Sequence, residues 1–434
     1  MLASTVTELA EALKTNRTTP TLDLSEKRLT DSEVTAIAEA LKTNKTLQHL
    51  DLTGNHLTDV GVIAIAEALK TNTHLQHLDL SYNGITDVGV IAITEALKTN
   101  KTLQHLDLYG NHLTEVGVIA IAEALKTNTT SLQNLDLSYN DIKEKGAGLI
   151  AEALKTNTTL QHLDLSYNGI KDEGAGLIVE ALKTNKTLQH LNLSGNHLTD
   201  VGVIAITEAL KTNTTSLQNL DLSGNHLTDV GVIAIAEALK TNTTLQHLDI
   251  YEDGITAEGA GLIAEALKTN TTLQHLDLSG NHLTDVGVIA IAEALKTNIH
   301  LQNLDIYEDG ITAEILKNIS YRIRFNSLLK KWREKTESAK VVEEAKEVVE
   351  EVKKIKFGES QESMYTNLQT EAISLLGDTV ENPIFNPKER NLLTRGIADP
   401  LNAKKFLPKK RRSVNIRRVK SPVGKKKSKR RFIS

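Results

Sequence analysis

The segment LQHLDL at residues 47–52 recurs along the chain and decides its fold. A shorter copy, TLDLSEKRLT at residues 21–30, precedes it, so the pattern contains eleven strand units. A fixed period of this length indicates an array of similar structural units. The first leucine of the motif returns in steps of 28 residues, with two steps of 29, at Leu47, Leu75, Leu103, Leu132, Leu160, Leu188, Leu217, Leu245, Leu273 and Leu301.

Each unit reads as a short strand followed by a helix. In the copy at residues 47–72, Leu50 and Leu52 alternate with polar residues, as in a strand with one buried face. The apolar residues from Val62 to Leu69 then follow at helical spacing. No single unit can bury both faces, so we expect an α/β solenoid in which neighbours stack. Strands pack about 4.8 Å apart and helices about 8–10 Å apart, which predicts a horseshoe with an inner parallel β-sheet and outer helices.

Several polar residues and one glycine of the unit suggest local roles. Thr58 is a good helix N-cap, and Asp59 places negative charge at the start of the helix. We expect Gly61 to let the helix approach the sheet and Asn72 to end the helix in the left-handed conformation. Asn55 recurs at the bend after most strands, where it can bond the backbone of neighbouring coils.

The repeat L-x-x-L-x-L-x-x-N-x-L resembles the ribonuclease-inhibitor type of leucine-rich repeat. This type also occurs in cytosolic nucleotide-binding immune receptors and intracellular bacterial effectors, and the resemblance covers residues 1 to about 326. It implies a horseshoe but does not name a partner, because such folds carry many unrelated functions. The chain has units of 28–29 residues throughout and no cysteine, so no ribonuclease-binding residues are transferred. A related GTPase-activating family has an acidic tail, whereas the C-terminal part of this chain is basic.

The sequence divides into three parts. Residues 1–326 form the predicted horseshoe, closed by a capping helix at 311–326, and residues 327–356 form a helical extension. Residues 357–434 are predicted to be largely disordered, because prolines interrupt them and residues 404–434 contain 15 Lys and Arg and no acid. The basic tail could bind nucleic acid or anionic lipid through its clustered cations, which include Lys409, Lys410, Arg411, Arg412, Arg417, Arg418, Lys425, Lys426 and Lys427.

Charge is distributed unevenly between the two ends. Residues 1–314 contain 20 Lys and Arg against 41 Asp and Glu, a net charge of −21, and residues 315–434 contain 30 against 14, a net charge of +16. The tail could therefore fold back and mask the horseshoe. The absence of cysteine excludes disulfides and thiolate metal sites, and no apolar run is long enough for a membrane span. No signal peptide is evident, so we expect a cytoplasmic protein, with a nuclear location or non-classical secretion into a host cell as alternatives.

The polar residues of the strand motif form two columns on the concave face. Three interpretations compete: a metal ladder, catalytic dyads, or a solvated ladder. We favour the solvated ladder and expect no metal, no cofactor and no catalytic residue, because His and Asp lie about 6.8 Å apart along a strand and each type meets its own type across strands. The stacked carboxylates predict raised histidine pKa values and an acidic, pH-sensitive surface. The columns contain His49, His77, His105, His162, His190, His247 and His275, and Asp23, Asp51, Asp79, Asp107, Asp136, Asp164, Asp221, Asp249, Asp277 and Asp305.

Variation between units points to a binding site. Six tyrosines follow the strands, four of them on consecutive units, where we expect one patch. The alternative is that these tyrosines are tolerated surface residues. The predicted partner-binding residues are Tyr82, Tyr109, Tyr139, Tyr167, Tyr251 and Tyr307, the flanking Glu252 and Glu308, and His77, Asp79, His105, Asp107, His162 and Asp164.

These features predict a non-enzymatic protein–protein interaction scaffold. Its acidic, tyrosine-bearing concave surface would bind a basic protein, and the tail would serve localisation or self-masking. The alternative is a protein tethered to nucleic acid or to an anionic membrane, which acts through the basic tail. The sequence does not indicate the oligomeric state.

Overall fold

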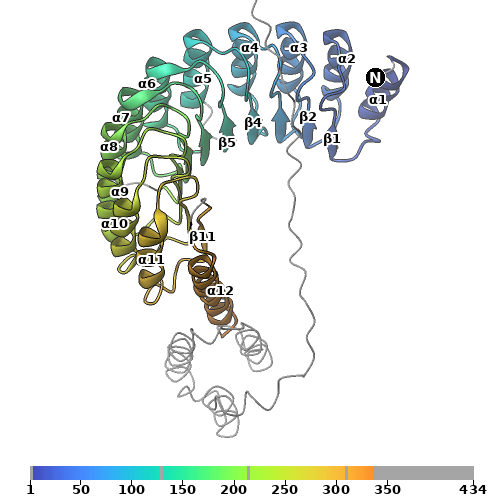
Figure 1. The fold of residues 1–434 in the computed structure, drawn as a ribbon. Helices are drawn as coiled ribbons and strands as arrows, with labels where there is room; N and C mark the ends of the chain where they lie inside the picture. The colour runs from blue at the N-terminus through green and yellow to red at the C-terminus, as the bar shows by residue number, and fades with distance from the viewer. Residues whose placement is uncertain (1–2, 128–130, 213–215, 308–310, 337–434) are drawn as a thin grey trace, which may run out of the picture. The chain divides into compact units, whose positions relative to one another are not determined.

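The computed structural model describes residues 3–127, 131–212, 216–307 and 311–336. Eleven three-residue strands form one parallel sheet in chain order (Figure 1). The predicted α/β solenoid is therefore confirmed. The strands are β1 Thr21–Asp23, β2 His49–Asp51, β3 His77–Asp79, β4 His105–Asp107, β5 Asn134–Asp136, β6 His162–Asp164, β7 His190–Asn192, β8 Asn219–Asp221, β9 His247–Asp249, β10 His275–Asp277 and β11 Asn303–Asp305.

A helix follows each strand, and a further helix precedes β1. In the array of units, the strands line the inner side of the curve and the helices line the outer side (Figure 1). The helices are α1 Ala3–Lys14, α2 Asp31–Leu41, α3 Asp59–Leu69, α4 Asp87–Leu97, α5 Glu115–Thr127, α6 Lys143–Leu154, α7 Lys171–Leu182, α8 Asp200–Lys211, α9 Asp229–Thr241, α10 Ala257–Leu267, α11 Thr284–Ala294 and α12 Ala313–Thr336.

Strand register follows the repeat residue by residue. His49 pairs with His77 and Asp51 pairs with Asp79, and the same correspondence continues across the sheet. The leucines of the motif face the core, as predicted: Leu50 is 2 % exposed, and the leucines on either side of it are fully buried. Identical residues therefore stand in columns on the concave face.

A ladder of buried asparagines joins the loops after the strands. Asn55 Oδ1 accepts hydrogen bonds from the backbone N–H groups of Lys27 (3.1 Å) and Leu29 (3.0 Å), both in the preceding unit. Its Nδ2 donates to the carbonyl of Leu24 (2.9 Å) and to that of Leu52 in its own unit (2.9 Å). The predicted role of Asn55 is confirmed, because these bonds satisfy backbone groups that no strand pairing serves.

A second ladder joins the starts of the helices. Thr58 caps α3, as predicted, and accepts from the N–H of Val60 (3.3 Å). Asp31 of the preceding helix accepts from the N–H groups of Thr58 and Gly61 (both 3.1 Å) and from Thr58 Oγ1 (2.6 Å). A Cβ on Gly61 would lie 2.6 Å from Asp31 Oδ1. Gly61 therefore makes room for this carboxylate, whereas the sequence had suggested a close approach to the sheet.

The prediction for Asn72 is wrong. It is not among the described residues with positive φ, so it does not end its helix in the left-handed conformation. Asn72 is buried, and its Nδ2 donates to the carbonyl of Leu41 in the preceding unit (2.7 Å). Its Oδ1 accepts from the N–H groups of His74 (2.9 Å) and Leu75 (2.8 Å). The side chain thus ties two neighbouring loops together.

Helix α12 packs against the last units. Ile319 is buried, and Asn326 Nδ2 donates to the carbonyls of Asn298 (2.9 Å) and Leu301 (2.8 Å). The helix continues to Thr336, and the rest of the predicted extension and the tail lie outside the described residues. Within the described ranges, no helix combines the length and apolar character that crossing a bilayer requires.

Candidate partner-binding face

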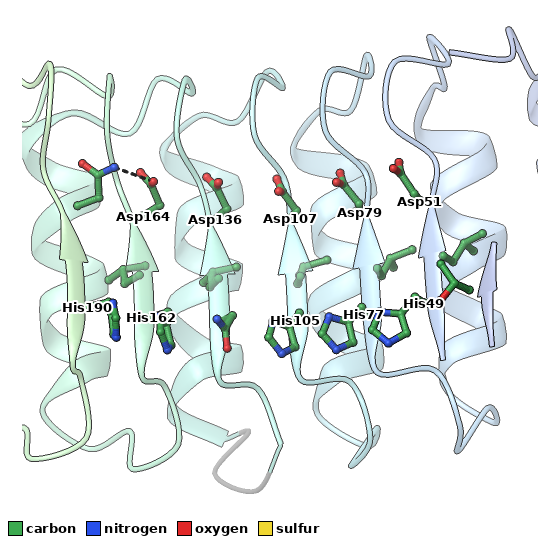
Figure 2. A pocket seen from close by; sticks show the side chains of 18 of the residues that line it. His49, Asp51, His77, Asp79, His105, Asp107, Asp136, His162, Asp164 and His190 are labelled. Carbon is green, nitrogen blue, oxygen red and sulfur yellow. Dashed lines mark hydrogen bonds between the residues drawn. The ribbon is translucent and has the colours of Figure 1, made fainter. Parts of the chain in front are cut away.

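The concave face of β1–β7 contains a shallow groove of about 490 Å³. Its floor consists of the two predicted columns, which run side by side across the strands (Figure 2). The imidazoles form one row and the carboxylates form the other, nearer the carboxyl ends of the strands (Figure 2). Both rows are half-buried.

The histidines stack on one another. The ring centroids of His49 and His77 are 3.9 Å apart and those of His77 and His105 are 3.7 Å apart, with nearly parallel planes. His162 and His190 form a similar pair at 3.8 Å, and a third pair lies on β9 and β10. Each stacked ring therefore contacts an imidazole of a neighbouring strand.

The aspartates hold the turns that follow the strands. Asp51 Oδ1 accepts from the N–H of Thr53 two residues later (2.9 Å), and Asp164 Oδ1 accepts from that of Ser166 (2.8 Å). The substitute in this column, Asn192, donates to Asp164 Oδ2 (2.9 Å; Figure 2). Asp followed two residues later by Ser or Thr is typical of an Asx turn, and this signal in the sequence could have revealed the structural role.

Ser81 joins two members of the carboxylate column. Its Oγ lies 2.6 Å from Asp79 Oδ1 and 2.5 Å from Asp107 Oδ1. Ser81 thus links the carboxylates of β3 and β4.

Four tyrosines on consecutive units come together, as predicted. The ring centroids of Tyr82 and Tyr109 are 4.5 Å apart, those of Tyr109 and Tyr139 are 5.1 Å apart, and those of Tyr139 and Tyr167 are 4.2 Å apart. The Tyr82 and Tyr109 hydroxyls are hydrogen-bonded. We call these four residues the tyrosine ledge. Tyr82, Tyr139 and Tyr167 are about half-exposed, with exposed fractions of 46–53 %.

Three ledge tyrosines adopt an unusual backbone conformation. Tyr82, Tyr139 and Tyr167 have φ of 48°, 51° and 53°, in the left-handed region. Five other units place a glycine with positive φ at the same position, for example Gly110, and two place a glutamate with positive φ there, Glu26 and Glu252. A Cβ on Gly110 would lie 2.9 Å from Tyr82 Cδ1, so this glycine makes room for the tyrosine ring of the preceding unit.

The remaining predicted site residues lie apart from the ledge. Tyr251 Oη donates to Glu252 Oε1 (2.5 Å), and Tyr307 on the last unit is 84 % exposed. Among the described residues, neither makes a ring contact with the ledge. Glu308 and the basic tail residues from Lys409 to Lys427 lie outside the described residues.

Family models recognise the repeats in the sequence. The model described as leucine rich repeat matches residues 43–66, 71–93, 99–122, 128–151, 156–179 and 269–292, and the model described as leucine rich repeats (2 copies) matches residues 186–240. The chain is a leucine-rich repeat protein. Neither description names the ribonuclease-inhibitor subclass, which stays a prediction.

Two solved structures illustrate the similarity of this chain to known folds. The tropomodulin C-terminal domain of Caenorhabditis elegans is 14 % identical, with a TM-score of 0.30, and the match covers 42 % of this chain and 95 % of that domain. A structure titled leiomodin-1 actin-binding site 2 is 21 % identical, with a TM-score of 0.24, and the match covers 50 % of this chain and 91 % of that one. No curated protein matches the chain.

The predicted rise in histidine pKa values is wrong for this leucine-rich repeat protein. Burial, followed by the neighbouring His105 and His49, lowers the pKa of His77 to about 4. Burial, followed by His162 and His247, likewise lowers the pKa of His190 to about 4. A protonated imidazole in a stack would lie against another imidazole, which lowers its pKa. The aspartates, which would raise the pKa, are two residues away along the strand.

Four carboxyls of the column, those of Asp107, Asp136, Asp221 and Asp249, have raised pKa values. Burial, followed by Asp107 and Asp164, raises the pKa of Asp136 to about 7. Burial, followed by Asp221, raises the pKa of Asp249 to about 6. The pH sensitivity of the floor therefore comes from its aspartates. In the described residues, no group of three or more His, Cys, Asp or Glu is arranged to hold a metal ion.

We expect the carboxyl of Asp136 to titrate at higher pH than the imidazole of His77, the reverse of their ordinary order. Carbon-13 NMR titration of labelled protein measures both. The histidines have lowered pKa values, so their effect is to reduce stability as pH falls from about 6.5 towards 4. Asp136 has a raised pKa, so its effect is to reduce stability as pH rises from about 4 to 7. Histidine midpoints at or above 6.5 would contradict this assignment.

Proposed function

We propose that this leucine-rich repeat protein is a non-enzymatic scaffold that binds a basic protein partner across the tyrosine ledge and the adjoining carboxylate column. Solenoids present extended concave surfaces suited to this task. Tyrosine offers a large contact area at low entropic cost and is frequent at binding hot spots. The partner would lay apolar or aromatic groups on the ledge and basic groups over the aspartates.

The backbone of the ledge carries the proposal. A non-glycine residue in the left-handed region is disfavoured by about 1–2 kcal/mol, and three ledge tyrosines accept that conformation. Glycine at the same position in five other units shows that the fold does not require tyrosine there. Residues held in such conformations cluster at functional sites. We infer that Tyr82, Tyr139 and Tyr167 serve contact with a partner.

Charge supports a basic partner. Residues 1–314 carry a net charge of −21, and the aspartate column adjoins the ledge because the aspartates end the strands that the tyrosines follow. Rows of carboxylates attract cationic side chains and accelerate encounter, an effect that salt screens. We expect binding to weaken as ionic strength rises.

The test uses a phage-displayed library of random peptides selected on the full-length protein. We expect the enriched peptides to be cationic and to contain apolar groups. The quadruple variant Tyr82→Ala, Tyr109→Ala, Tyr139→Ala and Tyr167→Ala should lose at least about tenfold in affinity for them, as expected when hot-spot side chains are removed. Val88→Ala on α4, an exposed position on the outer side, is the matched control and should leave affinity unchanged. Equal affinity of the quadruple variant and the wild type would refute the proposal.

A triple glycine variant separates binding from stability. Tyr82→Gly, Tyr139→Gly and Tyr167→Gly relieve the left-handed strain, so we expect a melting temperature equal to or above that of the wild type. Affinity for the selected peptides should still fall. A triple variant that binds as well as the wild type would show that the tyrosines are only tolerated surface residues.

A second candidate function rests on the tail. Residues 404–434 contain 15 Lys and Arg and no acid, which favours attachment to nucleic acid or an anionic membrane. Deleting these residues discriminates between the two functions. Loss of binding to DNA or to phosphatidylserine vesicles supports tethering, and a gain in peptide affinity at low salt supports self-masking of the concave face. We further propose a cytoplasmic location, with the nucleus or release into a host cell as alternatives that fractionation would distinguish.

A further inference from the structure

One rung of the asparagine ladder is an aspartate. Asp253 stands on the ninth unit at the position that Asn225 holds on the eighth and Asn281 on the tenth. In those rungs the side-chain amide is a donor: Asn225 Nδ2 donates to the carbonyl of Leu222 (2.6 Å), and Asn281 Nδ2 donates to that of Ile250 (2.8 Å). A carboxylate has no such hydrogen to offer.

The two oxygens of Asp253 have different surroundings. Oδ1 accepts from the N–H of Asn225 (3.0 Å), as an asparagine would. Oδ2 is buried without a hydrogen-bond partner, and the whole residue is 6 % exposed. The register of the ladder puts Oδ2 at the position of the missing amide, which in the other rungs faces one carbonyl oxygen 31 or 32 residues earlier and another about 3 residues earlier. For Asp253 these are the carbonyls of Leu222 and Ile250.

We propose that Asp253 is a neutral carboxylic acid in the folded protein and that its Oδ2–H donates to a carbonyl in place of the asparagine amide. A charged carboxylate at this place would bring a negative oxygen against carbonyl oxygens without water. Protonation turns the same atom into a donor and restores the rung. We call this rung between the eighth and ninth units the joint. Protonation of Asp253 strengthens the contact between the two units, and ionisation weakens it.

The charged groups around Asp253 favour the protonated form of its carboxyl. Asp221 of β8 and Asp249 of β9 are the ionisable groups that act on it, and both are acidic. The rungs on either side, Asn225 and Asn281, are uncharged. Burial, followed by these two aspartates, raises the pKa of Asp253 to about 7. The folded state therefore binds this proton more tightly than the unfolded state, and the stability it contributes declines as pH rises from about 4 to 7.

The position of the joint matters because a solenoid unit contacts only its neighbours. Loss of one rung weakens the contact of the ninth unit with the eighth while the other rungs remain intact. We expect local opening of residues 219–256 above neutral pH, ahead of the rest of the array. This inference is independent of the tyrosine ledge.

The test compares the full-length wild type with Asp253→Asn, which restores the ladder residue. We expect nearly equal urea midpoints at pH 4, and a midpoint for Asp253→Asn that rises above that of the wild type as pH increases towards 7 and stays higher at pH 8.5. The aspartates of the floor titrate in both proteins, so the difference between the two curves isolates Asp253. Hydrogen exchange of residues 219–256, corrected for the intrinsic pH dependence, should slow in the variant at pH 8.5.

A transplant of the acid supplies the matched control. Asn168→Asp places a carboxyl on another rung and should introduce a similar pH dependence there. Difference infrared spectra of wild type minus Asp253→Asn should contain the stretch of a protonated carboxyl at pH 5.5 that fades by pH 8.5. Parallel stability curves for wild type and Asp253→Asn, with no such band, would overturn the proposal.

Discussion

Asn196→Ala is expected to lower the free energy of unfolding by about 3 kcal/mol or more, since each buried group left unsatisfied costs about 1–3 kcal/mol. Asn196 is fully buried in the middle of the ladder. Its Oδ1 accepts from the N–H groups of Asn168 (3.0 Å) and Ile170 (3.2 Å), and its Nδ2 donates to the carbonyl of Leu165 (2.9 Å). Alanine leaves these groups without a partner and without water.

Urea denaturation of the full-length protein measures the loss at Asn196. Lys183→Ala is the control on the outer surface, where removal of an exposed ion pair with Glu180 should change stability by at most about 0.5 kcal/mol. Asn196→Asp should fall between wild type and alanine at acidic pH, because it keeps the acceptor and gains a donor when protonated. A loss below about 1 kcal/mol for Asn196→Ala would mean that the ladder contributes little.

Gly202→Ala should reduce stability by about 2 kcal/mol, although alanine is the better helix former by about 1 kcal/mol. Gly202 lies in the first turn of α8, and a Cβ there would stand 2.5 Å from Asp172 Oδ1. That carboxylate accepts from the N–H groups of Thr199 (2.8 Å) and Gly202 (3.0 Å), and from Thr199 Oγ1 (2.6 Å). The added methyl would displace it and break the link between units.

Two comparisons make the Gly202 prediction specific. Gly176→Ala in α7 should raise stability by about 0.5–1 kcal/mol, because no atom lies within 4 Å of a Cβ there and only helix propensity acts. In the Asp172→Ala background, Gly202→Ala should become neutral or stabilising, with a coupling of at least about 1 kcal/mol. Calorimetric melting of the wild type, the three single variants and the double variant measures these effects. Additive effects of the two substitutions would show that the carboxylate is not the obstacle.

The candidate site was partly predictable from the sequence. The period places Tyr82, Tyr109, Tyr139 and Tyr167 on consecutive units at the same strand end, so their proximity followed from counting residues. Their left-handed backbone was overlooked, although glycine at the same position in five other units, for example Gly110, was a signal in the sequence for positive φ. Asp79 was predicted to bind a partner, and its bond to the turn at Ser81 was overlooked.

The electrostatic prediction failed because it used the wrong neighbours. Reasoning from the strand motif paired each imidazole with the carboxylate two residues away, as for His77 and Asp79. In the structure the ring of His77 stacks on that of His105, with the ring centroids 3.7 Å apart, and both rings are half-buried. Desolvation and the neighbouring imidazoles then lower the pKa of His77 by more than the more distant carboxylate raises it.

The order of strands and helices, the burial of Leu50 and its equivalents, and the parallel stacking of units were determined by the sequence alone. Apolar side chains at these spacings are buried from water only when each unit stacks on the next one. The tertiary structure decided the interactions between units: the bond from the N–H of Gly61 to Asp31, the stacking of His49 on His77, and the burial of one Asp253 oxygen without a partner. The side-chain conformations and the path of each loop set these contacts, and the repeat pattern specifies neither.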